Sequence, residues 1–427
     1  MNGHRRFLEL LALGGCAFIL SKALLSFLLP PYMREAALHG EPMTDGSPEW
    51  RLILSISYLG IIMVLAPWYR ETIFVLRRNW PLVALVFFAL LSSLWAEMSS
   101  LVLRKSIGLF GATLLGIALA VRFSFQDHLR ILSWLFRVIT VLSLACIVLL
   151  PSYGISKDGE WRGIFEYKNA LGSMMGLSVL VEWQLPADSR ISKIVKSLAL
   201  LLSAVLLLFS DSITPTVVLI VALPLIEIYK FAALRLRVPL YAIFLATSIA
   251  VIAGVTLLVA NSDSVTSALG RSSNLSGRTE IWSLVLSAIA ERPIAGYGYS
   301  GFWLGATPES AVINRVMGGL IMYSHNGYLE ILLTLGVIGL LLTLAFLGMG
   351  MKRALSFSEQ RQSGTELWPL AFLLYFILHN LGECSILIQD LEWAICVSCI
   401  AGTDPMLLSF NVQQEDELPL VPMEELT

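Results

Sequence analysis

Residues 197–229 read SLALLLSAVLLLFSDSITPTVVLIVALPLIEIY, which is two apolar runs separated only by the polar turn from Asp211 to Thr214. A helix needs ~20 apolar residues to cross the hydrocarbon core of a bilayer, and each run approaches that length. A short turn between two helices leaves them antiparallel and adjacent. The stretch therefore predicts a tight hairpin of two membrane-spanning helices.

The rest of the chain has the same character. Apolar residues make up 56% of its 427 residues and charged residues only 14%, whereas a soluble domain is typically about one-quarter charged. We therefore expect an all-α fold, a polytopic membrane bundle of about 12 transmembrane helices with one large outer loop that contains short amphipathic helices. The expected spans are residues 7–29, 52–68, 80–95, 106–121, 131–150, 169–185, 197–210, 215–229, 240–260, 328–350, 368–382 and 387–403.

The large loop divides this predicted bundle. Residues 1–260 hold the first nine expected spans, residues 261–327 form the loop, residues 328–403 hold the last three spans, and residues 404–427 form an acidic tail. The first apolar run is too long for the apolar part of a signal peptide and lacks a small-residue cleavage site, so we interpret it as a span. An even number of spans places both termini on one side.

The distribution of Lys and Arg orients the bundle. Sixteen of these residues lie on the side of the termini and eleven on the opposite side. Because short cytoplasmic loops carry the excess of positive charge, we expect cytoplasmic N- and C-termini and an extracytoplasmic large loop. The net charge of −2 gives no indication of nucleic-acid binding.

The first distinctive outer sequence is WRGIFEYKNALG at residues 161–172, directly before a predicted span. An arginine such as Arg162 can bind a phosphate through two parallel hydrogen bonds, and Lys168 adds a point charge. If the helix begins near Asn169, its free backbone N–H groups also favour an anion. The alternative is an interfacial belt of Trp, Tyr and Lys that only sets the depth of the span.

The large loop contains a second distinctive stretch, SGRTEIWSLVLSAIAERP at residues 276–293. Its apolar residues recur with helical spacing, Ser276 is a suitable N-cap, and Pro293 and Gly296 end the pattern. We expect a short amphipathic helix on the outer surface with Arg278 in its first turn.

A run of glycines and aromatic residues, PIAGYGYSGFW at residues 293–303, follows this helix. The rings of Tyr297, Tyr299 and Trp303 are candidates for stacking on sugar faces, and the glycines would let backbone approach closely. The alternative is a turn-rich loop that packs on the bundle.

The loop ends with SHNGYLE at residues 324–330, where the tenth span opens. His325 lies at the boundary between water and membrane, and imidazole is the side chain best suited to accept a proton near neutral pH. Asn326 and Glu330 are candidates for supporting it. The alternative is a histidine that is only solvated or caps the helix.

Other polar residues in the apolar runs are weaker candidates. Arg137 and Lys22 lie within predicted spans, where an internal ion pair explains them as well as a function does. His379 lies near Glu383 in the eleventh span, and Cys396 and Cys399 are read as small apolar residues of a helix. No Walker loop, HExxH, GxSxG or outer DxD pair is present in the sequence, so we predict no metal and no cofactor.

Four of these blocks, together with LGVIG at 335–339, resemble in order and spacing the O-antigen ligase/polymerase superfamily, most closely the ExoQ-type exopolysaccharide polymerases. The resemblance implies a metal-independent glycosyltransferase with a GT-C-like fold in the bacterial inner membrane. It would polymerise polyprenyl-diphosphate-linked oligosaccharides at the periplasmic face during exopolysaccharide or O-antigen synthesis. Implied partners are this undecaprenyl-type donor, an acceptor glycan or lipid, the bilayer and other polysaccharide export proteins.

The resemblance also implies roles for individual residues. Arg162, Lys168 and Arg278 would hold the diphosphate, with Arg278 and His325 catalytic and Asn169 beside the first cations. One position departs from the family, which often has a basic residue where this chain has Ile213. Two alternatives remain: an O-antigen ligase with the same donor chemistry, and a transporter or flippase for lipid-linked sugars.

Overall fold

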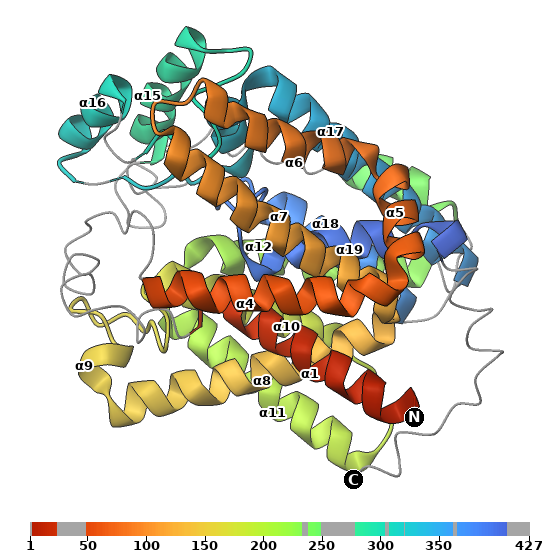
Figure 1. Ribbon diagram of the computed structural model, residues 1–427. Helices are drawn as coiled ribbons and strands as arrows, with labels where there is room; N and C mark the ends of the chain where they lie inside the picture. The colour runs from red at the N-terminus through yellow and green to blue at the C-terminus, as the bar shows by residue number, and fades with distance from the viewer. Residues whose placement is uncertain are drawn as a thin grey trace.

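The computed structural model describes residues 2–23, 48–232, 238–248, 278–303, 307–319, 321–361 and 365–407. These residues form α-helices joined by short loops, which confirms the predicted all-α fold (Figure 1). The helices are α1 (Asn2–Leu20), α4 (Pro48–Leu65), α5 (Tyr69–Arg78), α6 (Trp80–Leu91), α7 (Ser99–Arg122), α8 (Phe125–Leu149), α9 (Pro151–Gly154), α10 (Lys168–Gln184), α11 (Arg190–Phe209), α12 (Ile213–Phe231), α15 (Arg278–Glu291), α16 (Pro308–Met317), α17 (Gly327–Arg361), α18 (Trp368–His379) and α19 (Leu391–Gly402). Short 3-10 turns at Ala66–Trp68, Ser92–Leu94 and Thr365–Leu367 extend three of them.

Length and apolar composition identify the membrane-crossing helices. Within the described ranges, six helical stretches are long and apolar enough to cross a bilayer, and three shorter ones, including α18 and α19, are also apolar. The polytopic membrane architecture is therefore confirmed. The predicted span 240–260 lies mostly outside the described residues, so the total of twelve spans stays a prediction. The predicted N-cap Ser276 also lies outside the described residues.

The hairpin predicted from residues 197–229 has the expected turn, but it is not tight, because its two helices do not pack along each other. The first helix, α11, ends at Phe209, and α12 begins at Ile213. Asp211 makes the reversal with a left-handed backbone, φ 49°. The hairpin packs against α10, the helix that begins at the first distinctive outer block.

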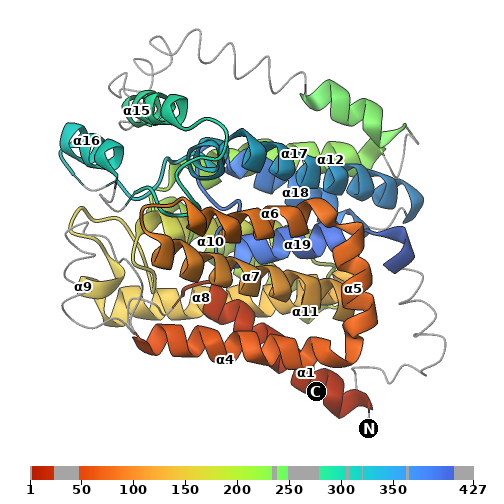
Figure 2. The same cartoon turned by 45° about the horizontal axis from the view of Figure 1, so that its top comes forward.

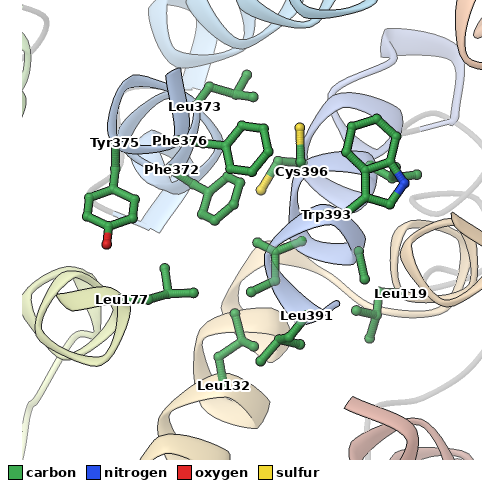
Figure 3. Close-up of a cluster of buried hydrophobic side chains, with 14 of the residues drawn as sticks. Leu119, Leu132, Leu177, Phe372, Leu373, Tyr375, Phe376, Leu391, Trp393 and Cys396 are labelled. Atoms are coloured by element: carbon green, nitrogen blue, oxygen red, sulfur yellow. The ribbon is translucent and has the colours of Figure 1, made fainter. Parts of the chain in front are cut away.

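The centre of the bundle is α19, which packs along α7 and contacts α17 and α18. Every residue of α19 is buried. Cys396 of this helix faces Phe372 and Phe376 of α18 within a continuous apolar cluster (Figure 3). The Trp393 ring lies on the other side of α19, where its indole N–H donates to Thr113 of α7 at 3.0 Å. Cys396 and Cys399 are buried free thiols in this packing, in agreement with their interpretation as apolar helix residues.

The two ends of the bundle carry different segments. In both views α9, α15 and α16 lie at one end, whereas α5 and the N-terminus lie at the other (Figures 1 and 2). The predicted outer blocks therefore share one end of the molecule, opposite the end that was predicted to be cytoplasmic. The compartment that each end faces stays a prediction.

Helix α17 is interrupted near its outer end. Gly336 has φ 64° and ψ −164°, a conformation that breaks the helical hydrogen bonding. The segment that follows α15 compensates for the break. The backbone N–H groups of Tyr297 and Gly298 donate to the carbonyls of Leu333 and Thr334 at 3.0 and 2.9 Å. In the other direction, the N–H of Val337 donates to the carbonyl of Pro293 at 2.8 Å, and that of Ile338 to Ile294 at 3.3 Å.

We expect Gly336→Ala to destabilise the protein strongly. A Cβ at this position would overlap the carbonyl oxygen of Ile294, and a left-handed backbone alone costs a non-glycine residue about 1–2 kcal/mol. The thermal unfolding midpoint in detergent, followed by tryptophan fluorescence, should fall by several degrees, and the amides of Tyr297 and Gly298 should exchange faster with deuterium.

Gly348→Ala is the matched control in the same helix. No atom lies within 4 Å of a Cβ placed there, so the added methyl should leave the midpoint unchanged or raise it slightly. Equal midpoints for the two variants would contradict the role assigned to the break.

Candidate functional site

Three charged or titratable side chains meet at the outer end of the bundle. Arg278 of α15 places Nη2 3.3 Å from Glu383 Oε1, and His325 Nδ1 lies 4.0 Å from the other carboxylate oxygen, Oε2. Glu383 belongs to the loop after α18, so three segments far apart in sequence converge here. The side chains of Arg278 and His325 are 21% and 24% exposed, whereas that of Glu383 is only 8% exposed. The cluster is thus open to water from the side of the arginine and the histidine.

Helix α15 positions Arg278. Its buried residues Ile281, Val285 and Ala288 pack the helix onto the outer half of α17. The indole N–H of Trp282 donates to the backbone carbonyl of Ser324 at 2.9 Å, which ties the helix that carries Arg278 to the loop that carries His325.

The loop around His325 is held by Glu330 and Asn326. One oxygen of Glu330 accepts from the indole N–H of Trp303 at 2.8 Å, and the other from the backbone N–H of Ser324 at 2.9 Å. Asn326 Oδ1 caps the start of α17. His325 itself adopts a left-handed backbone, φ 53°. The two residues predicted to support His325 therefore fix the backbone on both sides of it.

The turn between α11 and α12 provides the fourth side of the cluster. Thr214 Oγ1 accepts a hydrogen bond from Arg278 Nη1 at 3.1 Å. A Cβ at Gly382 would lie 3.2 Å from the same Nη1 atom, so a small residue there lets the guanidinium approach. At the position where the family often has a cation, Ile213 is 49% exposed, and its neighbour Thr214 makes the polar contact instead.

The first distinctive block reaches this turn from the other side. Helix α10 begins at Lys168, close to the predicted start at Asn169. Lys168 Nζ forms ion pairs with Glu160 at 2.7 Å and Asp211 at 3.6 Å, and Asn169 Oδ1 accepts from Ser212 at 3.4 Å. Lys168 and Asn169 thus lie beside the turn that also contacts Arg278.

Arg162 points elsewhere in this structure. Its Nε donates to the carbonyl of Tyr153 at 2.7 Å, and its guanidinium lies 5.7 Å from the Tyr153 ring. The nearby Glu166 is mostly buried, and this burial raises its pKa to about 7, against the opposing charges of Lys22 and Arg162. Lys168 thus pairs with Asp211 of the turn, Arg278 contacts Thr214 beside it, and His325 is linked to Arg278 through Glu383. Arg162 lies apart from them, against α9.

The three aromatic residues predicted to contact sugars are buried. Tyr297, Tyr299 and Trp303 are 1%, 6% and 4% exposed. Tyr297 and Trp303 both pack edge-on against Phe302, and Tyr299 donates its hydroxyl to the carbonyl of Leu387. Stacking on a sugar requires an open ring face, so in this structure these rings act as packing that holds the loop, the alternative that the sequence left open.

Burial and charge set the titration of the cluster. Burial, reinforced by the positive charge of Arg278, lowers the pKa of His325 to about 4. Burial raises the pKa of Glu383, and electrostatic interactions with His379 and Arg278 oppose that rise. His325 is therefore a neutral imidazole at physiological pH, which is the form that accepts a proton.

Two members of the cluster were not predicted from the sequence as site residues. Glu383 was noted only for its proximity to His379, and Thr214 only as the end of a turn. Their position in the sequence could have identified them, because both residues lie at the outer ends of predicted spans. In the described part of the chain, no group of three His, Cys, Asp or Glu side chains is arranged to hold a metal ion, and metal independence stays a prediction.

Comparison with known proteins gives the family that part of the chain resembles. Residues 198–344 match the family described as O-antigen ligase, a range that contains Thr214, Arg278 and His325. The chain is also 30% identical over 131 residues to the exopolysaccharide production protein ExoQ of Rhizobium meliloti strain 1021. That match covers 28% of this chain and 30% of the relative, so the chain spans less than a third of the protein it resembles. The resemblance inferred from the sequence blocks is thus confirmed: this chain is a multi-pass helical membrane protein whose residues 198–344 match the O-antigen ligase family and which is similar to ExoQ.

Proposed function

We propose that this protein is a glycosyltransferase that polymerises oligosaccharide repeat units carried on a polyprenyl diphosphate at the periplasmic face of the bacterial inner membrane. The observation that carries the proposal is the cluster of Arg278, Glu383 and His325 at one end of a membrane bundle, with Lys168 across the α11–α12 turn. A cation and a neutral imidazole at the outer end suit a reaction between an anionic, membrane-anchored donor and a sugar hydroxyl.

The donor diphosphate would lie between Arg278 and the start of α10. Arg278 offers a planar fork of N–H donors, and Lys168 adds a positive charge at a helix N-terminus whose first N–H groups point outward. Arg162 would make a further contact with the diphosphate if its guanidinium turned away from Tyr153. These groups stabilise the negative charge that grows on the diphosphate oxygen as the glycosidic bond breaks.

The acceptor sugar would supply its hydroxyl to His325. Because Nδ1 is buried on the side of Glu383, Nε2 is the nitrogen that accepts the hydroxyl proton. The hydroxyl oxygen forms a bond to the anomeric carbon, the bond from that carbon to the phosphate oxygen breaks, and its electron pair leaves with the polyprenyl diphosphate. His325 then releases the proton to water. The activated donor supplies the driving force, so neither ATP nor a metal is required.

We expect the purified protein in lipid nanodiscs to lengthen a lipid-linked oligosaccharide without ATP and in the presence of EDTA. Arg278→Ala and His325→Ala should each lower product formation by at least about a hundredfold, the usual contribution of a charge-stabilising or proton-accepting group. The measurement is gel or mass-spectrometric analysis of the product ladder.

The matched control is Arg315→Ala, which removes an exposed arginine of α16 at the same end of the molecule and should leave the ladder unchanged. Full activity in either site variant at normal membrane levels would refute the role assigned to that residue. A requirement for ATP would refute the mechanism.

The pH dependence of kcat/KM should report the free enzyme's histidine. Because the pKa of His325 is lowered to about 4, the neutral base persists as the pH falls, and kcat/KM should stay level from pH 8 to about pH 5.5. A loss of half the activity at or above pH 6.5 would show that His325 titrates like an ordinary exposed histidine and would contradict the burial argument.

The second candidate function is transfer of a finished polysaccharide by an O-antigen ligase, which is favoured by the description of the family that matches residues 198–344. Both reactions use the same donor chemistry, so the acceptor separates them. We prefer polymerisation because the similarity to ExoQ concerns exopolysaccharide production.

A deletion strain distinguishes these two functions. If the protein is a polymerase, long chains should disappear from the deletion strain while single repeat units remain, as read on carbohydrate gels. If long chains instead accumulate on the polyprenyl carrier, the protein is a ligase and the polymerase proposal is wrong. Restoration by the wild-type gene is the control.

The structure removes one observation that favoured a transporter. Arg137, which suggested a charged translocation path, forms a salt bridge with Glu182 at 2.8 Å, and Ser133 donates to the same carboxylate. The intramembrane charge is therefore compensated within the bundle, as expected for a structural ion pair.

A further inference from the structure

Glu383 is shared unequally between two partners. Its Oε1 accepts a hydrogen bond from Arg278 at 3.3 Å, whereas its Oε2 is 4.0 Å from His325 Nδ1, too far for a hydrogen bond. Within the described residues, His325 Nδ1 is a buried nitrogen without a hydrogen-bond partner. Such a group is costly unless the functional state supplies the missing partner.

The surroundings leave little choice of partner. Besides Glu383, the groups near His325 are Arg278, the tilted ring of Tyr323 with its centroid 4.3 Å from that of the imidazole, and the thiol of Cys384 beyond Ser324. Burial raises the pKa of Tyr323 and of Cys384 far above neutrality, so both stay uncharged. Among the described residues near His325, Glu383 is thus the one group that can offer a negative charge.

We propose that Glu383 is a positioning residue that moves between Arg278 and His325 when the donor binds. This inference rests on the proposed function, since it requires a diphosphate at Arg278. The diphosphate takes over the guanidinium, and the released carboxylate turns to accept the Nδ1–H of His325. Donor binding thereby fixes the tautomer of His325 that presents an unprotonated Nε2 and strengthens it as a base.

The energetics favour the exchange. Phosphate oxygens form strong bidentate hydrogen bonds with an arginine, and a buried carboxylate that loses its cation must find another partner or take up a proton. His325 Nδ1 lies about 1 Å beyond ordinary hydrogen-bond distance, so rotation of the Glu383 side chain suffices.

The backbone around Glu383 is fixed, so that only the side chain has to move. The N–H of Glu383 donates to the carbonyl of His379 at 2.9 Å, and its carbonyl accepts from the N–H of Gly327 at 3.0 Å. Thr214 remains hydrogen-bonded to the other arm of Arg278 and can keep the guanidinium in place during the exchange.

The test is the pH dependence of His325 carbethoxylation by diethyl pyrocarbonate, which reacts with the neutral imidazole. The full-length protein in nanodiscs is titrated with and without saturating farnesyl diphosphate, and His325 modification is quantified by peptide mass spectrometry. Farnesyl diphosphate binding is measured separately by calorimetry. Wild type, Glu383→Gln and the matched control Glu280→Gln are compared.

In the wild type, farnesyl diphosphate should raise the midpoint of the His325 titration by about one to two pH units, the size expected when a carboxylate becomes a hydrogen-bonded neighbour. The bound diphosphate also raises the midpoint directly through its own charge. Glu383→Gln retains this direct effect but cannot supply a carboxylate, so its shift should be less than half of the wild-type shift. Glu280→Gln neutralises an exposed carboxylate on the helix that carries Arg278 but leaves Glu383 intact, and its shift should match the wild type.

Each other outcome overturns the inference in a distinguishable way. Equal shifts in wild type and Glu383→Gln, with farnesyl diphosphate bound to both, show that the carboxylate does not move, and the proposed function survives. If farnesyl diphosphate binds the wild type but does not shift the midpoint of the His325 titration, the carboxylate likewise does not move and the proposed function survives. No binding to the wild type overturns the inference together with the donor site of the proposed function.

Discussion

The arrangement of the site depends on a break in one membrane helix. A backbone group that loses its helical partner at membrane depth must find another within the protein, because the hydrocarbon offers none. The break at Gly336 exposes carbonyls of Leu333 and Thr334 and N–H groups of Val337 and Ile338, and the segment 293–298 satisfies all four. The end of α15 is thereby fixed to α17. Since Arg278 begins α15 and His325 precedes α17, the hydrogen bonds at the break set the relative position of these two side chains.

The sequence predicts the bundle well and the site only in part. Apolar runs that approach the ~20 residues needed to cross a bilayer have few structures open to them, which is why the two helices at 197–229 and the start of α10 near Asn169 were predictable. The amphipathic spacing of residues 281–289 likewise indicated α15. Glu383 could not be recognised, because its role depends on a contact with Arg278 across 105 positions of the chain. The aromatic run at 297–303 fitted both sugar stacking and packing on the bundle for a related reason. Composition does not reveal whether a ring faces water or packs beside the break in α17.

The outer cations are also explained in part by their acidic partners. Lys168 pairs with Glu160 and Asp211, Arg292 with Glu97, and Arg278 with Glu383. Positive charge on the translocated side of a membrane is disfavoured, so in the predicted orientation these pairs would compensate for it locally. The partners differ in burial, since Asp211 is 59% exposed and Glu383 only 8%. Salt screens exposed pairs much more than buried ones, so Arg278 and Glu383 are the pair whose separation has the larger energetic consequence.

Reciprocal hydrogen bonds join residues 293–298 to residues 333–338. These two segments therefore have to be exchanged together when parts of the chain are replaced by those of a relative. A homologous outer loop that is grafted without its own helix break would present backbone groups in the wrong register, whatever its side chains. The smallest segment that can be exchanged between relatives therefore runs from Arg278 through Ile338. A chimera that exchanges the loop and the broken helix together keeps these hydrogen bonds, whereas one that exchanges the loop alone loses them.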